Sequence, residues 1–404
     1  MQGIWKVGRL ARVLRDRSSI LFNTEQLHAI GVSCFSLQWR YSHTNLVSSS
    51  CSALYGNPMQ MESKCQRVVS SLKCHVSQRS SYSSKAIDVG SGSTDGSVPN
   101  AETVKEIYEK ILKSIVDQKT APPNAYLWSL IAKCANEDDI KLLFDILQRL
   151  RIFRLSNLRI HENFNCALCQ EVTKACIRVG AITFGQKALY KHNLYGLTPN
   201  VGSAHHLLMF AKKHNDVDLM VDIMKLVSKN ELPLQPGTAD LVFSICYHND
   251  KWELMCKYGK MFVKGGARLR QGSFDLWMDF AAKMGDVDSL WKIEKIRSES
   301  MNHHTISSAF SCAKALLIES KSEEAAAIIQ VFYENLPVSK RQSITSELQK
   351  LVNEWPIEVI KRQKEESRKE LARTLQSGIS AMVDALSSIG AKMDVNVERV
   401  TIGV

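Results

Sequence analysis

The chain of 404 residues lacks most of the sequence signals that mark enzymes and membrane proteins. It has no glycine-rich phosphate-binding loop, no G-x-S-x-G nucleophile turn and no H-E-x-x-H zinc motif. No window of 18 apolar residues occurs, so we expect no membrane insertion. The N-terminus has no secretory apolar core, so the 11 cysteines are predicted to be free thiols. We therefore expect a non-enzymatic protein without a cofactor or a metal.

Cys166 and Cys169 form the sequence's nearest approach to a metal motif. No second pair follows at zinc-finger spacing, so four ligands are missing. Residues three apart share a helix face, and buried thiols explain the pair better. The pairs His205–His206 and His303–His304 place adjacent side chains on different helix faces, which makes poor shared ligand sites.

Acidic residues are scarce in residues 1–86, where eleven Lys and Arg face three acids, a net charge of +8. This Arg-rich, Ser-rich composition is typical of an organelle transit peptide, and residues 4–15 can form its basic amphipathic helix. The plainer interpretation is a disordered basic tail. We predict the mitochondrial matrix, with the plastid as the alternative, and processing near Arg40 or later in the Ser-rich run.

The rest of the chain is nearly neutral, because the total of +11 leaves only +3 outside residues 1–86. Strong nonspecific nucleic-acid binding requires the neutralisation of many phosphates. Any RNA site must therefore be local. Residues 87–101 are rich in Gly and Ser and are predicted to form a linker.

Helical breaks recur through the middle of the chain. The stretch 166–200 holds two apolar-periodic segments, separated by Gly180 and closed by Gly196-Leu-Thr-Pro-Asn200. Further breaks follow Gly180 at intervals of 35, 34 and 36 residues, at Asn215, Asn249 and Gly285. Two short helices cannot bury both apolar faces alone, so such units must stack. We predict an all-α fold: an α-solenoid of about six helical hairpins within residues 102–343, opened by a capping helix.

Two features of the array carry further predictions. About seven extra residues around Arg159–Asn165 are expected to lengthen a loop. Six aromatic residues at helical spacing are expected in the core rather than as base-stacking platforms. They are Trp252, Phe262, Phe274, Trp277, Phe280 and Trp291.

Residues 344–404 form a separate C-terminal region with one long helix predicted from Ile357 to about Ile389. A stripe close to a heptad seam follows its charged opening, at Leu371, Leu375, Ile379, Met382, Leu386 and Ile389. Such a stripe requires a partner, which is the chain's own last hairpin or a helix of another chain. The charged opening, residues 361–373, is a solvated face or a contact with RNA phosphate.

The unit at 166–200, with its central and terminal breaks, resembles the pentatricopeptide repeat family of organelle RNA-binding proteins, over residues 124–343. The Trp, Leu-Gly and Tyr pattern of the related tetratricopeptide unit is absent. The resemblance implies that the first helices line a groove in which each repeat faces one RNA base. It also implies two reading positions, ten residues before the mid-repeat break and at the last residue of the repeat.

Carried onto this chain, the first reading position falls on Trp128, Gln170, His205, Ala239, Asp275 and Phe310. The second falls on Asn200 and near Gln235. Family members that read bases usually have Asn, Ser or Thr at the first position, so the two bulky aromatics and the alanine depart from the pattern. The resemblance implies these RNA-binding residues: Gln170, Asn200, His205 and Asp275.

Two functions follow from the resemblance. The first is a non-enzymatic factor that binds single-stranded RNA in mitochondrial RNA processing, stability or translation. The second is a structural subunit of the mitochondrial ribosome whose solenoid holds rRNA and neighbouring proteins. Family members with editing or nuclease activity carry further C-terminal domains, and residues 344–404 lack their metal-ligand pattern.

Overall fold

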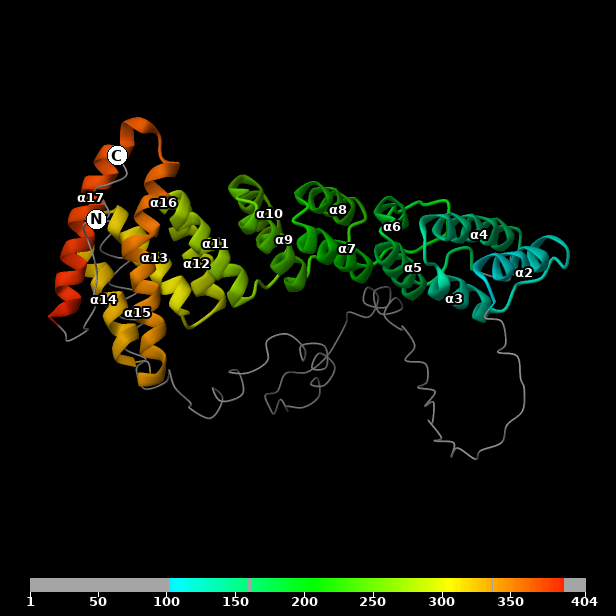
Figure 1. Cartoon of the computed structure of the whole chain (residues 1–404), viewed down its shortest axis with the longest axis horizontal. Helices are drawn as coiled ribbons and strands as arrows, with labels where there is room; N and C mark the ends of the chain where they lie inside the picture. Colours follow the sequence, from blue (N-terminus) through cyan, green and yellow to red (C-terminus); the bar gives the residue numbers. More distant parts are fainter. Residues whose placement is uncertain (1–101, 158–160, 336, 389–404) are drawn as a thin grey trace, which may run out of the picture. The chain divides into compact units, whose positions relative to one another are not determined.

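The computed structural model describes residues 102–157, 161–335 and 337–388. Within these ranges the secondary structure is α-helical, with no β-strand (Figure 1), which confirms the predicted all-α class. None of the helices described there is long and apolar enough to cross a membrane. The transit peptide and the linker predicted within residues 1–101 lie outside the described residues.

Helix α2, the predicted capping helix, spans Val104–Val116 and packs against both α3 and α4. Thr103 caps it, because its hydroxyl accepts from the Glu106 amide while the Glu106 carboxylate accepts from the Thr103 amide. The helices that follow are α3 (Asn124–Lys133), α4 (Glu137–Ser156), α5 (Cys166–Val179), α6 (Ile182–Ala188), α7 (Val201–His214), α8 (Val217–Lys229), α9 (Pro236–His248), α10 (Trp252–Lys264), α11 (Gln271–Met284), α12 (Val287–Ser300), α13 (Ile306–Ile318) and α14 (Ser322–Asn335).

Packing along this series is sequential. From α5 to α14, each odd-numbered helix packs on the even-numbered helix that follows it. From α5 to α13, each odd-numbered helix also packs on the next odd-numbered one. We call the odd-numbered helices α3 to α13 first helices and the even-numbered helices α4 to α14 second helices.

The spacing of the first helices is regular. The residues that precede α5, α7, α9, α11 and α13 are 35 positions apart: Asn165, Asn200, Gln235, Arg270 and Thr305. The turn after each of these helices contains one residue with positive φ, again at 35-residue intervals: Gly180, Asn215, Asp250, Gly285 and Ser320. This left-handed residue reverses the chain into the second helix. The break predicted at Asn249 is thus one residue early.

Apolar side chains between the helices form two clusters, one over α2 to α6 and one from α7 to the C-terminal helices. Five of the six predicted core aromatics are buried, and Trp252 is partly buried against the second cluster. The prediction that these rings belong to the core is confirmed.

The extra residues of the first hairpin lengthen a helix as well as a connection. Helix α4 has 20 residues, whereas the second helices α8, α10, α12 and α14 have 13 or 14. The prediction of a longer loop alone was therefore wrong. Helix α6 has only 7 residues, and the chain continues without helix to Asn200.

The C-terminal region is not one long helix. Helix α15 (Val338–Asn353) begins before residue 344, and α16 (Trp355–Arg362) and α17 (Glu365–Ser387) follow it, with a break at Gln363–Lys364. We use C-terminal region below for α15 to α17. The break is stabilised from outside the region, since Gln363 Nε2 donates to the carbonyl of Met284 at 2.9 Å. Helix α17 packs on α13 and α14 (Figure 1). Four residues of the predicted stripe are buried there: Leu375, Ile379, Met382 and Leu386.

Helix α16 packs on α11, so the C-terminal region also covers the turn between α11 and α12. Trp355 Nε1 donates to the carbonyl of Ala282 at 2.9 Å, and Arg362 forms a salt bridge with Asp250 at 2.7 Å. Gly285 leaves room for this contact, because a Cβ there would lie 2.6 Å from Gln363 Nε2 and 3.2 Å from Val359 Cγ2.

Replacing Gly285 by asparagine is expected to release α16. Asparagine tolerates the left-handed conformation, as Asn215 does at the equivalent turn, so the main effect is the collision with Gln363. We expect amide hydrogen exchange in α16 to accelerate by about tenfold or more. The matched control is Gly180→Asn, where a Cβ meets nothing within 4 Å and exchange in α16 should not change. Equal protection of α16 in both variants would contradict this account.

Candidate nucleic-acid interface

The predicted reading residues lie at one position in the first helices. Counted from the start of each helix, the fifth residues are Trp128, Gln170, His205, Asp240, Asp275 and Phe310. The structure corrects one assignment, since Asp240 and not Ala239 occupies this position in α9. Ala239 is fully buried in the core. Ala239 follows from counting the position back from Asn249, whereas the left-handed residue of this turn is Asp250.

The fifth residues of α5 and α7 bond to the first helix that follows. Gln170 Nε2 lies 3.1 Å from His206 Nε2 on α7. His205 Nε2 lies 2.8 Å from the Thr238 hydroxyl on α9. His206 thus contacts the preceding first helix, α5, and His205 contacts the following one, α9. This agrees with the expectation that adjacent side chains lie on different helix faces.

The fifth residues of α9 and α11, Asp240 and Asp275, bond through their carboxylates to the next first helix or to the residue before it. Asp240 accepts from Ser273 of α11 at 2.6 Å and pairs with Arg270, the residue before α11, at 2.8 Å. Asp275 accepts from the hydroxyl of Thr305, the residue before α13, at 2.6 Å. At both junctions the fifth residue of one first helix therefore bonds to the residue that precedes the next first helix.

Glycine at the second position of a first helix permits this arrangement. A Cβ on Gly202 would lie 2.9 Å from Gln170 Oε1, and one on Gly237 would lie 3.0 Å from His205 Cε1. The fifth side chain thus lies across the first turn of the next helix, where a Cβ at the second position would displace it.

Asn200 acts as a helix cap. Its Oδ1 accepts from the Ser203 amide at 2.7 Å, and its Nδ2 donates to the carbonyl of Cys166 at 3.1 Å. A cap of this kind satisfies one of the unpaired amides at the start of α7. The side chain is engaged at both ends by the protein.

Electrostatics at these junctions do not favour phosphate. Burial, followed by the charges of His206 and Arg270, lowers the pKa of His205 from 6.5, so its ring is uncharged at neutral pH. Burial raises the pKa of Asp275, against the hydrogen bond from Thr305. Neither group supplies the positive charge that an RNA backbone requires.

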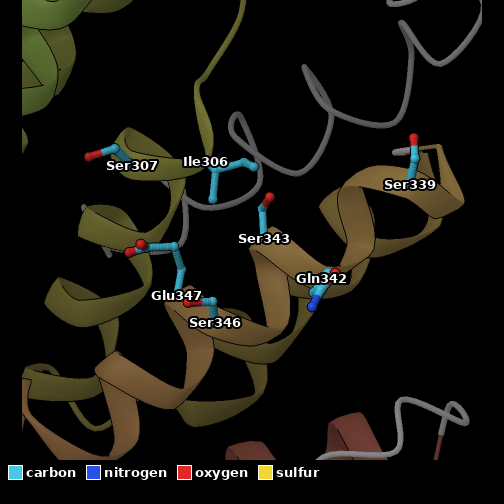
Figure 2. Close-up of a pocket in the computed structure, with 7 residues that line it drawn as sticks. All are labelled: Ile306, Ser307, Ser339, Gln342, Ser343, Ser346 and Glu347. Atoms are coloured by element: carbon cyan, nitrogen blue, oxygen red, sulfur yellow. The ribbon is translucent and has the colours of Figure 1, made fainter. Parts of the chain in front are cut away.

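At the last junction the fifth residue, Phe310, is 2% exposed, and α15 packs on α13. A surface cavity of about 550 Å³ lies between the two helices. Figure 2 shows Ser343 and Glu347 on the side of α15 that faces Ile306 and Ser307. Glu347 is the one charged residue among the described residues of the lining, which makes this cavity a poor site for phosphate.

The first junction differs from the others. Trp128, the fifth residue of α3, is 41% exposed and borders a cavity of about 480 Å³. Asn165, the residue before α5, borders the same cavity, so the two reading positions face a common open space. The Asn165 Oδ1 caps α5 through the Leu168 amide, and its NH₂ group has no bonding partner within the described ranges.

Polar and cationic groups complete the wall of this cavity. Arg154 stacks over the Phe164 ring at 4.2 Å and donates to the carbonyl of Asn163 at 3.2 Å, which fixes a positive charge at the rim. His161 and the Asn163 side chain lie beside it. An exposed indole, a guanidinium and amide donors can bind a base and its phosphate together. The seven extra residues before Asn165 were the only sequence signal of this cavity.

The cysteine pair does not form one site. Cys169 is fully buried, with its thiol 3.5 Å from the Ala188 carbonyl, whereas Cys166 is exposed. Within the described residues one cluster has three ligand types, Glu294, His304 and Cys312. Both Glu294 oxygens already accept from Arg297, at 2.7 and 2.8 Å, so this cluster is a buried ion pair.

Comparison of the sequence with models of known protein families and with curated proteins gives no match, so the pentatricopeptide resemblance remains a prediction from the repeat pattern.

Proposed function

We propose that this chain is a non-enzymatic RNA-binding protein of mitochondrial gene expression, built as an α-solenoid of about six pentatricopeptide-like hairpins. The sequential packing of α5 to α14 and the 35-residue spacing of their turns support the repeat architecture. The acid-poor composition of residues 1–86 supports the mitochondrion, with the plastid as the alternative compartment.

The observation that carries the RNA-binding proposal is the open cavity beside Trp128. At the next four junctions the fifth side chain is engaged by the following helix, and at the last it is buried. The first junction alone presents an aromatic face, a cation and amide donors to one space. We infer that a single-stranded segment stacks one base on Trp128 and sets a phosphate against Arg154.

Replacing Trp128 by alanine is expected to weaken binding of single-stranded RNA by about 5- to 150-fold, because one base–aromatic stack is worth about 1–3 kcal/mol. The helix should survive the change, since Trp128 is not part of the buried core. Fluorescence anisotropy with a labelled oligoribonucleotide measures the affinity, and circular dichroism checks the fold.

The matched control is Tyr190→Ala, because Tyr190 is an equally exposed aromatic residue, at 48%, that does not line the cavity. Its affinity for RNA should equal that of the unmutated chain. Equal affinities for both variants would remove the cavity as the binding site. A complete lack of RNA binding by the unmutated chain would overturn the proposed function itself.

A second candidate is a structural subunit of the mitochondrial ribosome. It is favoured by the closed junctions, whose side chains stabilise the stack of helices instead of facing a ligand. Sedimentation of a mitochondrial lysate separates the two candidates. Comigration with one ribosomal subunit at high salt, lost only when magnesium is chelated, would establish the structural role. Light fractions, or an RNase-sensitive shift, would establish a transcript-bound factor.

A further inference from the structure

The outward faces of α8, α10 and α12 carry a group of lysines that recurs with the 35-residue period. Three sets of lysines lie 35 residues apart. They are Lys225, Lys260 and Lys295; Lys229 and Lys264; and Lys257 and Lys292. All seven are exposed. We call these seven residues the lysine block.

The amphipathic pattern of the helices places the block on the surface. In α10 the opposite face buries Met255, Tyr258 and Phe262 in the core. Lysines at 257, 260 and 264 follow one another at spacings of three and four residues, which keeps them on one helix face. They span about 10 Å of helix, a length over which a stacked single strand presents about three phosphates.

Most of these charges have no partner in the protein. Lys225 pairs with Asp222 at 2.9 Å, and no other member of the block forms a salt bridge within the described ranges. Glu253 and Asp288 lie four residues before Lys257 and Lys292, a spacing that allows helix pairs, but no such pair forms.

Helix stabilisation explains only part of the block. Lys229 and Lys264 lie in the last turns of α8 and α10, where they favour the helix dipole. Lys257, Lys260 and Lys292 lie further inside their helices and gain nothing from it. Three of the six acids of these helices lie in the first turns, at Asp218, Glu253 and Asp288. Asp222 pairs with Lys225, Glu294 is buried, and Glu299 is exposed four residues after Lys295.

We propose that the lysine block is a docking surface for the sugar–phosphate backbone of RNA, separate from the cavity beside Trp128. Charge complementarity selects a polyanion, and lysine side chains contact phosphates without reading the sequence of bases. This inference rests on the proposed RNA binding and adds a second surface, on the second helices. A near-neutral body whose exposed lysines recur on three successive second helices agrees with the earlier requirement that an RNA site be local.

The test is the double charge reversal Lys260→Glu with Lys264→Glu in the full chain. We expect single-stranded RNA to bind about tenfold more weakly or worse at low salt. The slope of log affinity against log salt should fall in magnitude by about 1.4, at about 0.7 per lost phosphate contact. The matched control, Lys105→Glu with Lys113→Glu on α2, changes the net charge equally at exposed lysines outside the block. Its affinity should fall clearly less than that of the Lys260/Lys264 variant, because Lys105 and Lys113 belong neither to the block nor to the lining of the cavity beside Trp128.

Equal effects of the two double variants would show that only net charge matters and would overturn the proposal. An unchanged salt slope in the Lys260/Lys264 variant, together with weaker binding by Trp128→Ala, would overturn this surface and leave the proposed function intact. Absence of RNA binding by the unmutated chain would overturn both. If partners captured on the block survive RNase treatment, the surface binds an acidic protein and the RNA assignment is wrong.

Discussion

Replacing Arg297 by methionine is expected to lower the free energy of unfolding by about 3–5 kcal/mol. Arg297 and Glu294 lie one turn apart on α12 and are 3% and 5% exposed. The guanidinium donates to both carboxylate oxygens, at 2.7 and 2.8 Å. Its removal leaves the buried carboxylate with His304 as its one remaining side-chain partner in the described ranges, 3.3 Å away. Urea denaturation followed by circular dichroism measures the loss.

The same guanidinium ties α12 to the connection that precedes α13. Its Nη1 donates to the carbonyl of His303 at 2.8 Å, and its Nη2 lies 2.7 Å from His304 Nε2. His304 Nδ1 in turn lies 3.2 Å from the Ser308 hydroxyl. Loss of the arginine therefore also loosens the start of α13.

Arg149→Met is the matched control, because Arg149 and Asp145 form an exposed pair within α4, with side chains 47% and 39% exposed. We expect that variant to lose only about 0–1 kcal/mol. The double variant Glu294→Leu with Arg297→Met should lose less than Arg297→Met alone, because no charge is left buried without a partner. A loss in Arg297→Met no larger than in Arg149→Met would contradict the assignment.

The buried pair also sets a response to acid. Burial raises the pKa of the Glu294 carboxyl, but hydrogen bonds and charges of Arg297 and His304 outweigh it, so the pKa lies below its ordinary value of 4.5. Such a group adds stability above pH 4.5, and this is lost as the pH falls through the lower folded value. In Arg297→Met the main opposing contact is gone, so acid unfolding should begin at a higher pH.

Replacing Gly259 by alanine is expected to cost about 2–3 kcal/mol of stability, although alanine favours helix by about 1 kcal/mol. A Cβ at this position in α10 would lie 2.6 Å from Cη2 and 2.8 Å from Cε2 of Trp277 on α11. The indole is 4% exposed and rigid, so the two helices must separate. Thermal and urea unfolding give the change in free energy.

Two variants isolate the collision. Gly272→Ala, where a Cβ meets nothing within 4 Å, should leave stability unchanged or slightly raised. In a Trp277→Phe background, Gly259→Ala should cost under about 1 kcal/mol, because the smaller ring leaves room. Trp277→Phe also changes the contact of the indole with the Cys256 thiol, so the single Trp277→Phe variant is the reference for this cost. An undiminished cost in that background would point to a cause other than the indole.

The period of the array could be predicted from sequence, because a left-handed residue and an apolar helix recur together. The register of α9 could not, since Asn249 and Asp250 both tolerate the left-handed conformation and only the backbone shows that Asp250 adopts it. That one-residue ambiguity misplaced the reading position onto Ala239.

The break between α16 and α17 has no local signal. Neither glycine nor proline interrupts residues 357–388 apart from Gly378, which lies inside α17. The helix stops at Gln363 because that side chain bonds to Met284, 79 residues earlier in the chain. Contacts over such separations are not encoded in local periodicity.

Three of the candidate residues, Gln170, His205 and Asp275, lie at the fifth position of a first helix, but their partners could not be predicted. Polar type alone does not show whether a side chain faces a groove or the next helix. Glycine at 202 and 237 decides this for Gln170 and His205, and only the packed structure reveals the close approach. The prediction that Gln170, Asn200, His205 and Asp275 bind RNA remains untested.

The equal spacing of the first helices determines what the loss of one 35-residue unit would do to the packing of the helices. Removal of residues 201–235, one whole unit, would join Asn200 to Pro236 and carry α5 to the place that α7 now occupies beside α9. Gln170 would then lie against Gly237 in place of Gly202, again a glycine. The helix register at the new junction would be kept, but the residue equivalent to His206 is Leu241, so Gln170 would lose its present hydrogen bond. The two ends, closed by α2 and by α15 to α17, are the parts that cannot be exchanged.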